Sequence, residues 1–157
     1  MKKGLMKKRL LYTTLGLSLA LGAQQTAPQK GNPQSVTLTP GFLKLVDDAK
    51  SRVTQIDIES YKKMVAAREP HVLVDTREDS EWATGHTAGA VHLSKGIIER
   101  DIETRYPDKT TKLVLYCGGG ARSALAADNL QKMGYTNVMS LDGGWRVLRE
   151  SGLPIEK

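Results

Sequence analysis

The sequence predicts an α/β domain with a mostly parallel sheet covered by helices on both faces. The first observation is a set of four short apolar runs, each four or five residues long: HVLVD at 71–75, AVHL at 90–93, KLVLY at 112–116 and NVMSL at 137–141. The second is that helical or loop material separates the runs, since strands that alternate with helices usually pair in parallel and are buried on both sides. A further run at 53–56 is expected to add a fifth strand at the edge.

Two short helices are expected before the strand at 71–75. Thr39 and Pro40 offer a helix start, with proline at the first helical position, and this helix is expected to end at about Arg52. Its apolar residues recur at helical spacing: Phe42, Leu45, Val46 and Ala49. The second helix is expected to begin at Asp57 or Ser60 and to end at Ala67. Its inner face is expected to comprise Ile58, Tyr61, Met64 and Val65.

Two more helices are expected in the second half of the chain. One spans residues 121–133, where apolar residues recur three positions apart, and Gly134 ends it. The other spans residues 145–150 and stops before Gly152 and Pro154.

The first 23 residues have the layout of a secretory signal peptide. A basic start leads into an apolar run at residues 10–21, which small residues follow, and cleavage is expected after Gly22 or Ala23. The run is shorter than the ~20 residues of a stable transmembrane helix. An uncleaved anchor is therefore the less favoured alternative, and no stable membrane insertion is expected after cleavage. The mature protein is expected to be periplasmic or secreted, with a flexible linker at 24–39, rich in Gln, Pro, Thr and Ser, before a domain at 40–157.

Charge and composition narrow the classes of partner. The chain is 39% hydrophobic and 25% charged, which is typical of a soluble globular domain. Its net charge is +6, but five of the excess positive charges are carried by the first nine residues, so the remainder carries only +1. A nucleic-acid groove needs clustered positive charge on the folded domain. We therefore expect no nucleic-acid partner.

The single cysteine, Cys117, directly follows the expected strand at 112–116. A lone cysteine in an exported protein indicates a reactive or intermolecular thiol, with an inert buried residue as the alternative. Ligands bind at the carboxyl ends of parallel strands, and Gly118 to Gly120 leave room for backbone N–H groups to converge on an anion before the next helix. Such a loop stabilises a thiolate, and Arg122 adds a positive charge beside it.

Four motifs in order resemble those of the rhodanese family. They are VDTRE at 74–78, GHTAGAVHL at 85–93, CGGGAR at 117–122, and GGW at 143–145 followed by GLP at 152–154. The third has the Cys-x-x-Gly-x-Arg skeleton of that family's active loop. The resemblance covers about residues 53–157, preceded by the short helix that begins at Pro40. It implies a central five-stranded, largely parallel sheet with helices on both faces, and sulfurtransferase activity.

The resemblance also implies roles for the residues of the loop. Cys117 would be the nucleophile and sulfur carrier. Backbone amides would hold the persulfide and the departing anion; the loop residues concerned are Gly118, Gly119, Gly120, Ala121 and Arg122. The Arg122 side chain would orient an anionic donor or brace the loop. Neither a metal nor an organic cofactor is expected. The donor would be a small sulfur-containing anion, and the acceptor a small thiophile such as cyanide or a thiol, or a partner protein.

Four alternatives to this interpretation follow from the sequence. Cysteine phosphatases typically have five residues between Cys and Arg, whereas this loop has four, which disfavours them. Many thiosulfate-using members of the family carry a charge inside the loop, whereas residues 118–121 are uncharged, so a persulfide or polysulfide donor stays open beside thiosulfate. The rival from another class is a non-turnover module that carries sulfur for a partner or binds one. Thiol redox chemistry is disfavoured because the chain has no second cysteine.

The remaining candidates have plainer interpretations. Asp75 and Arg77 could approach the active site, but an ion pair that fixes the turn is favoured. The three histidines fit no standard metal-ligand spacing and are interpreted as structural; they are His71, His86 and His92. The turn at 142–144 is expected at the same sheet edge as Cys117.

Overall fold

A computed structural model describes residues 37–157 of the chain. The predicted signal peptide at 1–23 lies outside the described residues, as does the predicted linker except for its last three residues. None of the helices between residues 37 and 157 has the length and apolar character that crossing a membrane requires.

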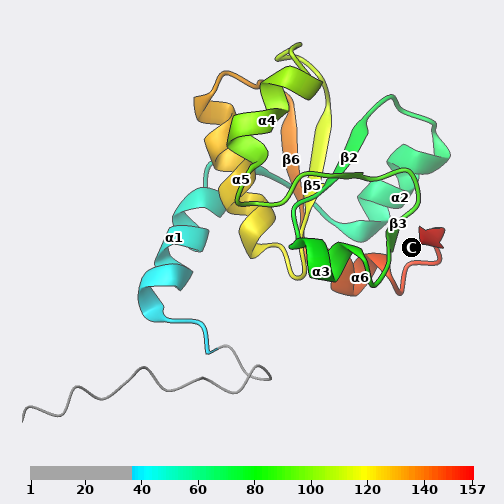
Figure 1. Cartoon of the computed structure of the whole chain (residues 1–157), viewed down its shortest axis with the longest axis horizontal. Helices are drawn as coiled ribbons and strands as arrows, with labels where there is room; N and C mark the ends of the chain where they lie inside the picture. The colour runs from blue at the N-terminus through cyan, green and yellow to red at the C-terminus, as the bar shows by residue number, and fades with distance from the viewer. Residues whose placement is uncertain (1–36) are drawn as a thin grey trace, which may run out of the picture. The chain divides into compact units, whose positions relative to one another are not determined.

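A five-stranded parallel sheet lies at the centre of the domain (Figure 1). Its strand order is β1-β6-β5-β2-β4, and every neighbouring pair is parallel. The strands are β1 (Thr54–Ile56), β2 (Val72–Asp75), β4 (Val91–His92), β5 (Leu113–Tyr116) and β6 (Val138–Leu141). The predicted mostly parallel sheet is confirmed, with β1 at the edge. Because β5 is the middle strand, Cys117 leaves the sheet at its centre.

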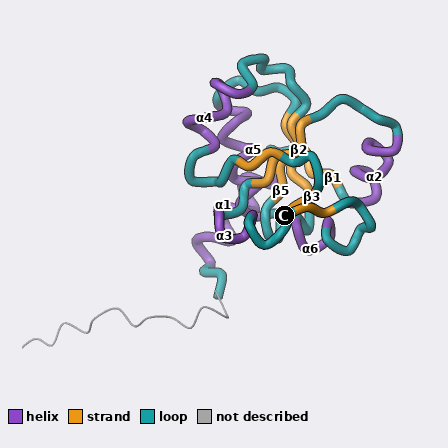
Figure 2. Tube along the Cα trace, turned by 45° about the vertical axis from the view of Figure 1, so that its right-hand side comes forward, coloured by secondary structure: helices purple, strands orange, loops and turns teal. Residues whose placement is uncertain are grey.

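Helices cover both faces of the sheet, as predicted (Figure 2). Helices α4 (Ile98–Arg105) and α5 (Ala121–Lys132) pack on one face, and α2 (Ile58–Ala66) and α6 (Trp145–Leu148) on the other. Strand β5 shows why the strands are apolar throughout. Successive side chains point to opposite faces, so Leu113 and Leu115 enter the first core while Val114 and Tyr116 enter the second, all fully buried.

The helix before the sheet, α1 (Pro40–Lys50), starts as predicted, with Thr39 accepting a hydrogen bond from the backbone N–H of Phe42. It packs along α5 and buries Val46 and Ala49. Leu45, one of the apolar residues at helical spacing, faces solvent and is 60% exposed. Within the described residues, α5 is the helix that α1 contacts most, so a narrow stripe of α1 is covered.

Three features of the fold were not predicted. Helix α3 (Asp79–Trp82) is a single turn, and α4 has two apolar residues, Ile98 and Ile102, which both reach the core. Strand β3 (His86–Thr87) pairs antiparallel with β7 (Ile155–Glu156) to form a separate two-stranded sheet. Strands of two residues give no periodic signal, and this pairing joins distant parts of the chain. The last helix also ends earlier than expected, at Leu148.

Candidate active site

The site is built around Cys117, the first residue after β5. A loop of four residues leads to α5, and Gly120, with φ +96°, closes it in the left-handed conformation that favours glycine. This turn directs the Gly120 N–H to the Cys117 Sγ at 3.1 Å. The hydroxyl of Ser123 lies 3.7 Å from the same sulfur. The sulfur therefore has one backbone donor, at the start of α5, and one hydroxyl within reach.

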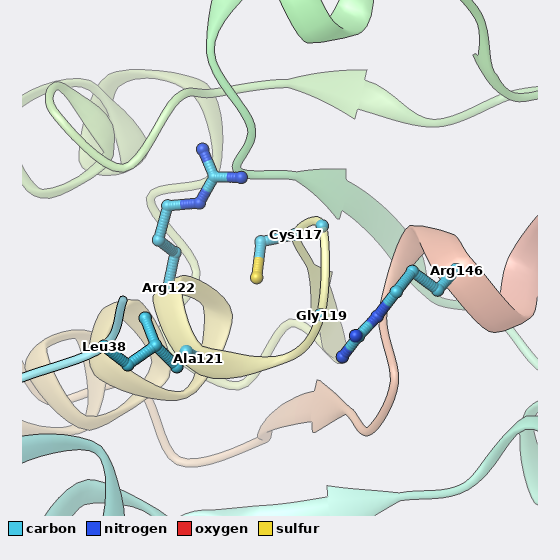
Figure 3. Close-up of a pocket in the computed structure, with 7 residues that line it drawn as sticks. Leu38, Cys117, Gly119, Ala121, Arg122 and Arg146 are labelled. Carbon is cyan, nitrogen blue, oxygen red and sulfur yellow. The ribbon is translucent and has the colours of Figure 1, made fainter. Parts of the chain in front are cut away.

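A pocket of about 340 Å³ opens beside the sulfur (Figure 3). Its wall comprises Leu38, Cys117, Gly118, Gly119, Ala121, Arg122 and Arg146. Five of the six residues expected from the cysteine loop thus line one pocket, and the sixth, Gly120, is buried behind it. Leu38 and Arg146 were not expected. Cys117 is only 2% exposed, so a reagent reaches the sulfur through this pocket.

The guanidinium of Arg122 lies on one side of the sulfur (Figure 3), where an added Cβ at Gly118 would come within 3.2 Å of its Nη2. It donates two hydrogen bonds to the Glu81 carboxylate, at 2.6 and 2.8 Å, and a third to Glu78 at 3.2 Å. The bonds to Glu81 raise the pKa of Arg122, although desolvation opposes the shift. The Arg122 side chain was expected either to orient an anionic donor or to brace the loop. Its bonds are those of a brace, because they connect the start of α5 to α3.

A second guanidinium, that of Arg146, lies on the other side of the sulfur (Figure 3). It rests over Gly119, where an added Cβ would come within 2.6 Å of the Arg146 Nη2. Among residues 37–157 it forms no ion pair, in contrast to Arg122. Sequence reasoning missed Arg146, although it directly follows the GGW motif, because the sequence alone does not show how α6 meets the cysteine loop.

Residues at and just after the GGW motif (143–145) hold the cysteine loop through backbone hydrogen bonds. The N–H of Trp145 donates to the Cys117 carbonyl at 2.6 Å, and the N–H of Arg146 donates to the Gly118 carbonyl at 3.3 Å. Only glycine fits at 144, since a Cβ there would lie 2.2 Å from the Cys117 carbonyl oxygen. The expectation that residues 142–144 share the sheet edge of Cys117 is confirmed.

Asp75 and Arg77 form a buried ion pair, with exposed fractions of 0% and 2%. The Arg77 Nη2 donates to Asp75 at 2.7 Å and to the Gly85 carbonyl at 2.8 Å. The guanidinium also lies 4.5 Å from the ring of Trp145. Neither residue lines the pocket. The pair supports the site indirectly: the Arg77 guanidinium packs on Trp145, and the Trp145 N–H donates to the Cys117 carbonyl.

The histidines lie away from the pocket. His86 and His92 stack on Trp82, with ring centroids 3.3 and 4.9 Å apart. The Nε2 of His92 lies 2.9 Å from the Arg77 carbonyl. Between residues 37 and 157 no three His, Cys, Asp or Glu side chains gather in a way that could hold a metal ion.

Most of the described residues match a known family model, that of the rhodanese-like domain, at residues 57–151. A sulfurtransferase of Allochromatium vinosum is 37% identical over 103 residues, which are 66% of this chain and 94% of that protein. The thiosulfate sulfurtransferase GlpE of Pseudomonas entomophila is 36% identical over 80 residues, which are 51% of this chain and 72% of that protein.

The fold is similar to solved structures as well. A Rhodopseudomonas palustris protein of unknown function, described as a possible tyrosine phosphatase, matches with a TM-score of 0.64 at 29% identity. The match covers 80% of this chain and 100% of the other.

Proposed function

The chain belongs to the rhodanese-like domain family, and we propose that it is a sulfurtransferase that carries sulfane sulfur as a persulfide on Cys117. The observation that carries the proposal is the placement of the Cys117 sulfur. It faces an open pocket at the end of the central strand and accepts a backbone N–H at 3.1 Å. Donors fixed in advance around a sulfur stabilise negative charge there before and after transfer.

The first half-reaction loads the sulfur. The Cys117 thiol gives its proton to solvent, and the thiolate attacks the outer sulfur of thiosulfate. A bond forms between the Cys117 Sγ and that sulfur, the sulfur–sulfur bond of thiosulfate breaks, and its electron pair leaves with sulfite. The enzyme then holds a persulfide anion, and the total charge is unchanged. The Gly120 N–H and the Ser123 hydroxyl are placed to stabilise this anion.

The second half-reaction unloads the sulfur. A thiophilic acceptor such as cyanide, a thiol or a protein thiolate attacks the outer sulfur of the persulfide. The new bond forms on the acceptor, and the electron pair of the broken sulfur–sulfur bond returns to Cys117 as thiolate. Cyanide and a thiolate attack as anions, and a thiol acceptor first gives its proton to solvent, so this step needs no side-chain base. Histidines stacked on Trp82, away from the pocket, are consistent with this chemistry.

Phosphate-ester hydrolysis is the less suitable function for this pocket, although the matched Rhodopseudomonas palustris protein is described as a possible phosphatase. The arginine that ends the cysteine loop is bound to two carboxylates. An arginine in that state is a poor ligand for a phosphate. Thiosulfate is the donor we propose, and it is the donor named for the Pseudomonas entomophila relative.

The intact mass of the protein before and after incubation with thiosulfate tests the proposal. We expect a gain of ~32 Da, the mass of one sulfur, that cyanide removes. The Cys117→Ser variant, with its fold verified by circular dichroism, should show no gain. A gain in the variant would overturn the role of Cys117. No gain in the wild type, with thiosulfate or with polysulfide, would overturn sulfur transfer.

Steady-state kinetics separate an enzyme from a carrier. An enzyme should form thiocyanate from thiosulfate and cyanide through many turnovers. A non-turnover carrier, the rival function, would gain one sulfur and release it to cyanide no more than once per protein molecule. That second result would retain Cys117 as a sulfur carrier while removing the assignment as an enzyme.

A further inference from the structure

We infer that Arg146 is the residue that recognises the anionic end of the sulfur donor. The inference rests on the proposed function, because it assigns the donor subsite of the same pocket. Two guanidinium groups flank the Cys117 sulfur, one on each side (Figure 3). Their electrostatic situations differ, and that difference decides which one attracts a small anion.

The positive charge of Arg122 is already balanced. Its guanidinium makes three hydrogen bonds to the carboxylates of Glu81 and Glu78. A donor anion that approached Arg122 would also meet these two carboxylates. Arg122 and its partners together therefore present no net positive charge to the pocket.

The charge of Arg146 is available. No carboxylate within residues 37–157 forms an ion pair with it, and its guanidinium lies over the loop at Gly119. The backbone N–H of Arg146 donates to the Gly118 carbonyl and so fixes this residue beside the loop. Gly119 leaves room for the guanidinium, because a Cβ at this position would lie 2.6 Å from the Arg146 Nη2.

The opposite wall of the pocket gives the donor a direction. It is formed by the apolar side chains of Leu38 and Ala121 (Figure 3). A donor with one charged end therefore orients that end toward Arg146 and away from Leu38. The sulfur to be transferred then faces Cys117, and the departing sulfite stays beside the guanidinium. The donor class is therefore a small oxyanion that bears a sulfane sulfur. Residues 118–121 of the loop are uncharged, and Arg146 of α6 supplies the positive charge beside them.

Paired alkylating reagents test this inference without using sulfur transfer. Iodoacetate and iodoacetamide both alkylate a thiolate, forming a carbon–sulfur bond and releasing iodide, but only iodoacetate carries a carboxylate. In Arg146→Ala we expect the rate of Cys117 alkylation by iodoacetate to fall about fivefold, and the rate with iodoacetamide to change less than about 1.5-fold. Salt at 0.5 M should reduce the difference in iodoacetate rate between the wild type and Arg146→Ala, because it screens an exposed charge.

Arg149→Ala is the matched control. It removes the same charge one residue beyond α6, where Arg149 pairs with Glu150 at 3.4 Å and does not line the pocket. Both reagents should alkylate this variant at wild-type rates. Equal loss with the two reagents in Arg146→Ala, or an equal loss of iodoacetate reactivity in Arg149→Ala, would overturn the inference.

Thiosulfate loading then links the subsite to the donor. In Arg146→Ala the thiosulfate concentration for half-maximal loading should rise about tenfold, as expected when one exposed charge contact is lost. If the wild type takes no sulfur at all, the proposed function fails while the alkylation ratio still reports on Arg146. If loading proceeds but is unchanged in Arg146→Ala, the donor subsite is wrong and the function stands.

Discussion

Ser123 shows how the chemistry of the site depends on one hydroxyl. Its Oγ accepts a hydrogen bond from Ser140 at 2.9 Å and lies 3.2 Å from the Gly120 carbonyl and 3.7 Å from the Cys117 sulfur. The single proton of Ser123 serves one of these two acceptors at a time. When the sulfur is anionic, it is the stronger acceptor. Both serines are fully buried, so the pair forms a short donor chain aimed at the sulfur.

In Ser123→Ala we expect the rate of sulfur loading to fall roughly fivefold, the equivalent of about 1 kcal/mol for a hydrogen bond to the reacting anion. Stopped-flow quenching followed by intact-mass measurement gives the rate. Ser140→Ala is the control, because it also removes a buried hydroxyl yet leaves the Ser123 hydroxyl beside the sulfur. Equal rates in the two variants would mean that Ser123 acts only through packing.

The reactive loop could be predicted from the sequence because its signals are local. Cys117 follows an apolar run directly, and the glycines follow the cysteine. The contacts that decide the pocket's charge are not local. Glu81 lies 41 positions before Arg122, and Arg146 meets Gly119 only because α6 docks behind the loop. A pattern of residue types along the chain contains neither pairing, so Glu81 and Arg146 were missed.

At the scale of elements, α1 shapes the site although it precedes the part of the chain that matches the family model. The segment before it carries Leu38 into the pocket wall. Two ion pairs anchor the end of this helix. Arg52 binds Asp128 of α5 at 2.8 and 3.0 Å, and Lys50 binds Asp142 at 3.0 Å. The position of Leu38 therefore depends on how α1 is attached.

Asp128 makes this attachment dependent on pH. The Arg52 hydrogen bond, helped by one from Lys132, lowers the pKa of Asp128 to about 2, while desolvation opposes the shift. A carboxylate with a lowered pKa in the folded state stabilises that state at pH values above about 4, its ordinary pKa. The contribution is lost as the pH falls toward 2.

We therefore expect Asp128→Asn to lower the free energy of unfolding by about 1 kcal/mol at pH 7. The effect is modest because Arg52 and Lys132, the two partners of Asp128, are largely exposed. The difference from wild type should shrink steadily between pH 4 and pH 2. Urea unfolding followed by circular dichroism at each pH measures it. Asp48→Asn is the control, because its ion pair with Lys44 is exposed on both sides and should contribute little at any pH. A pH-independent loss in Asp128→Asn would contradict an electrostatic attachment.

Strands and long helices could be predicted because burial imposes a pattern on them, and the smaller elements could not. Strand β5 is apolar at all four positions since both of its faces are covered. Strands β3 and β7 have two residues each, and their pairing joins His86 to Glu156. The apolar period of α1 is also wider than its buried face, because Leu45 is exposed to solvent.

On the scale of the whole molecule, three distant segments hold one loop. Helix α3 binds its end through Glu81 and Arg122, α6 binds its carbonyls through backbone N–H groups, and Leu38 lines its open side. An exported protein would hold this thiol in an oxidising compartment. The chain offers no second cysteine for an internal disulfide. The lack of a second cysteine is compatible with our proposal that the protein is exported.

Export predicts a definite mature mass. When residues 1–157 are produced in a bacterium with two membranes, we expect the protein in the periplasmic fraction, with residues 1–22 or 1–23 removed. A basic start, an apolar run and small residues are the features of a cleaved signal peptide. Loss of this segment removes five positive charges, so the mature chain should also focus at a much lower pH than the precursor. Leu17→Arg interrupts the apolar run and should keep the precursor uncleaved. A full-length wild-type mass in the membrane fraction would favour an uncleaved anchor, whereas a full-length mass in the cytoplasm would contradict export.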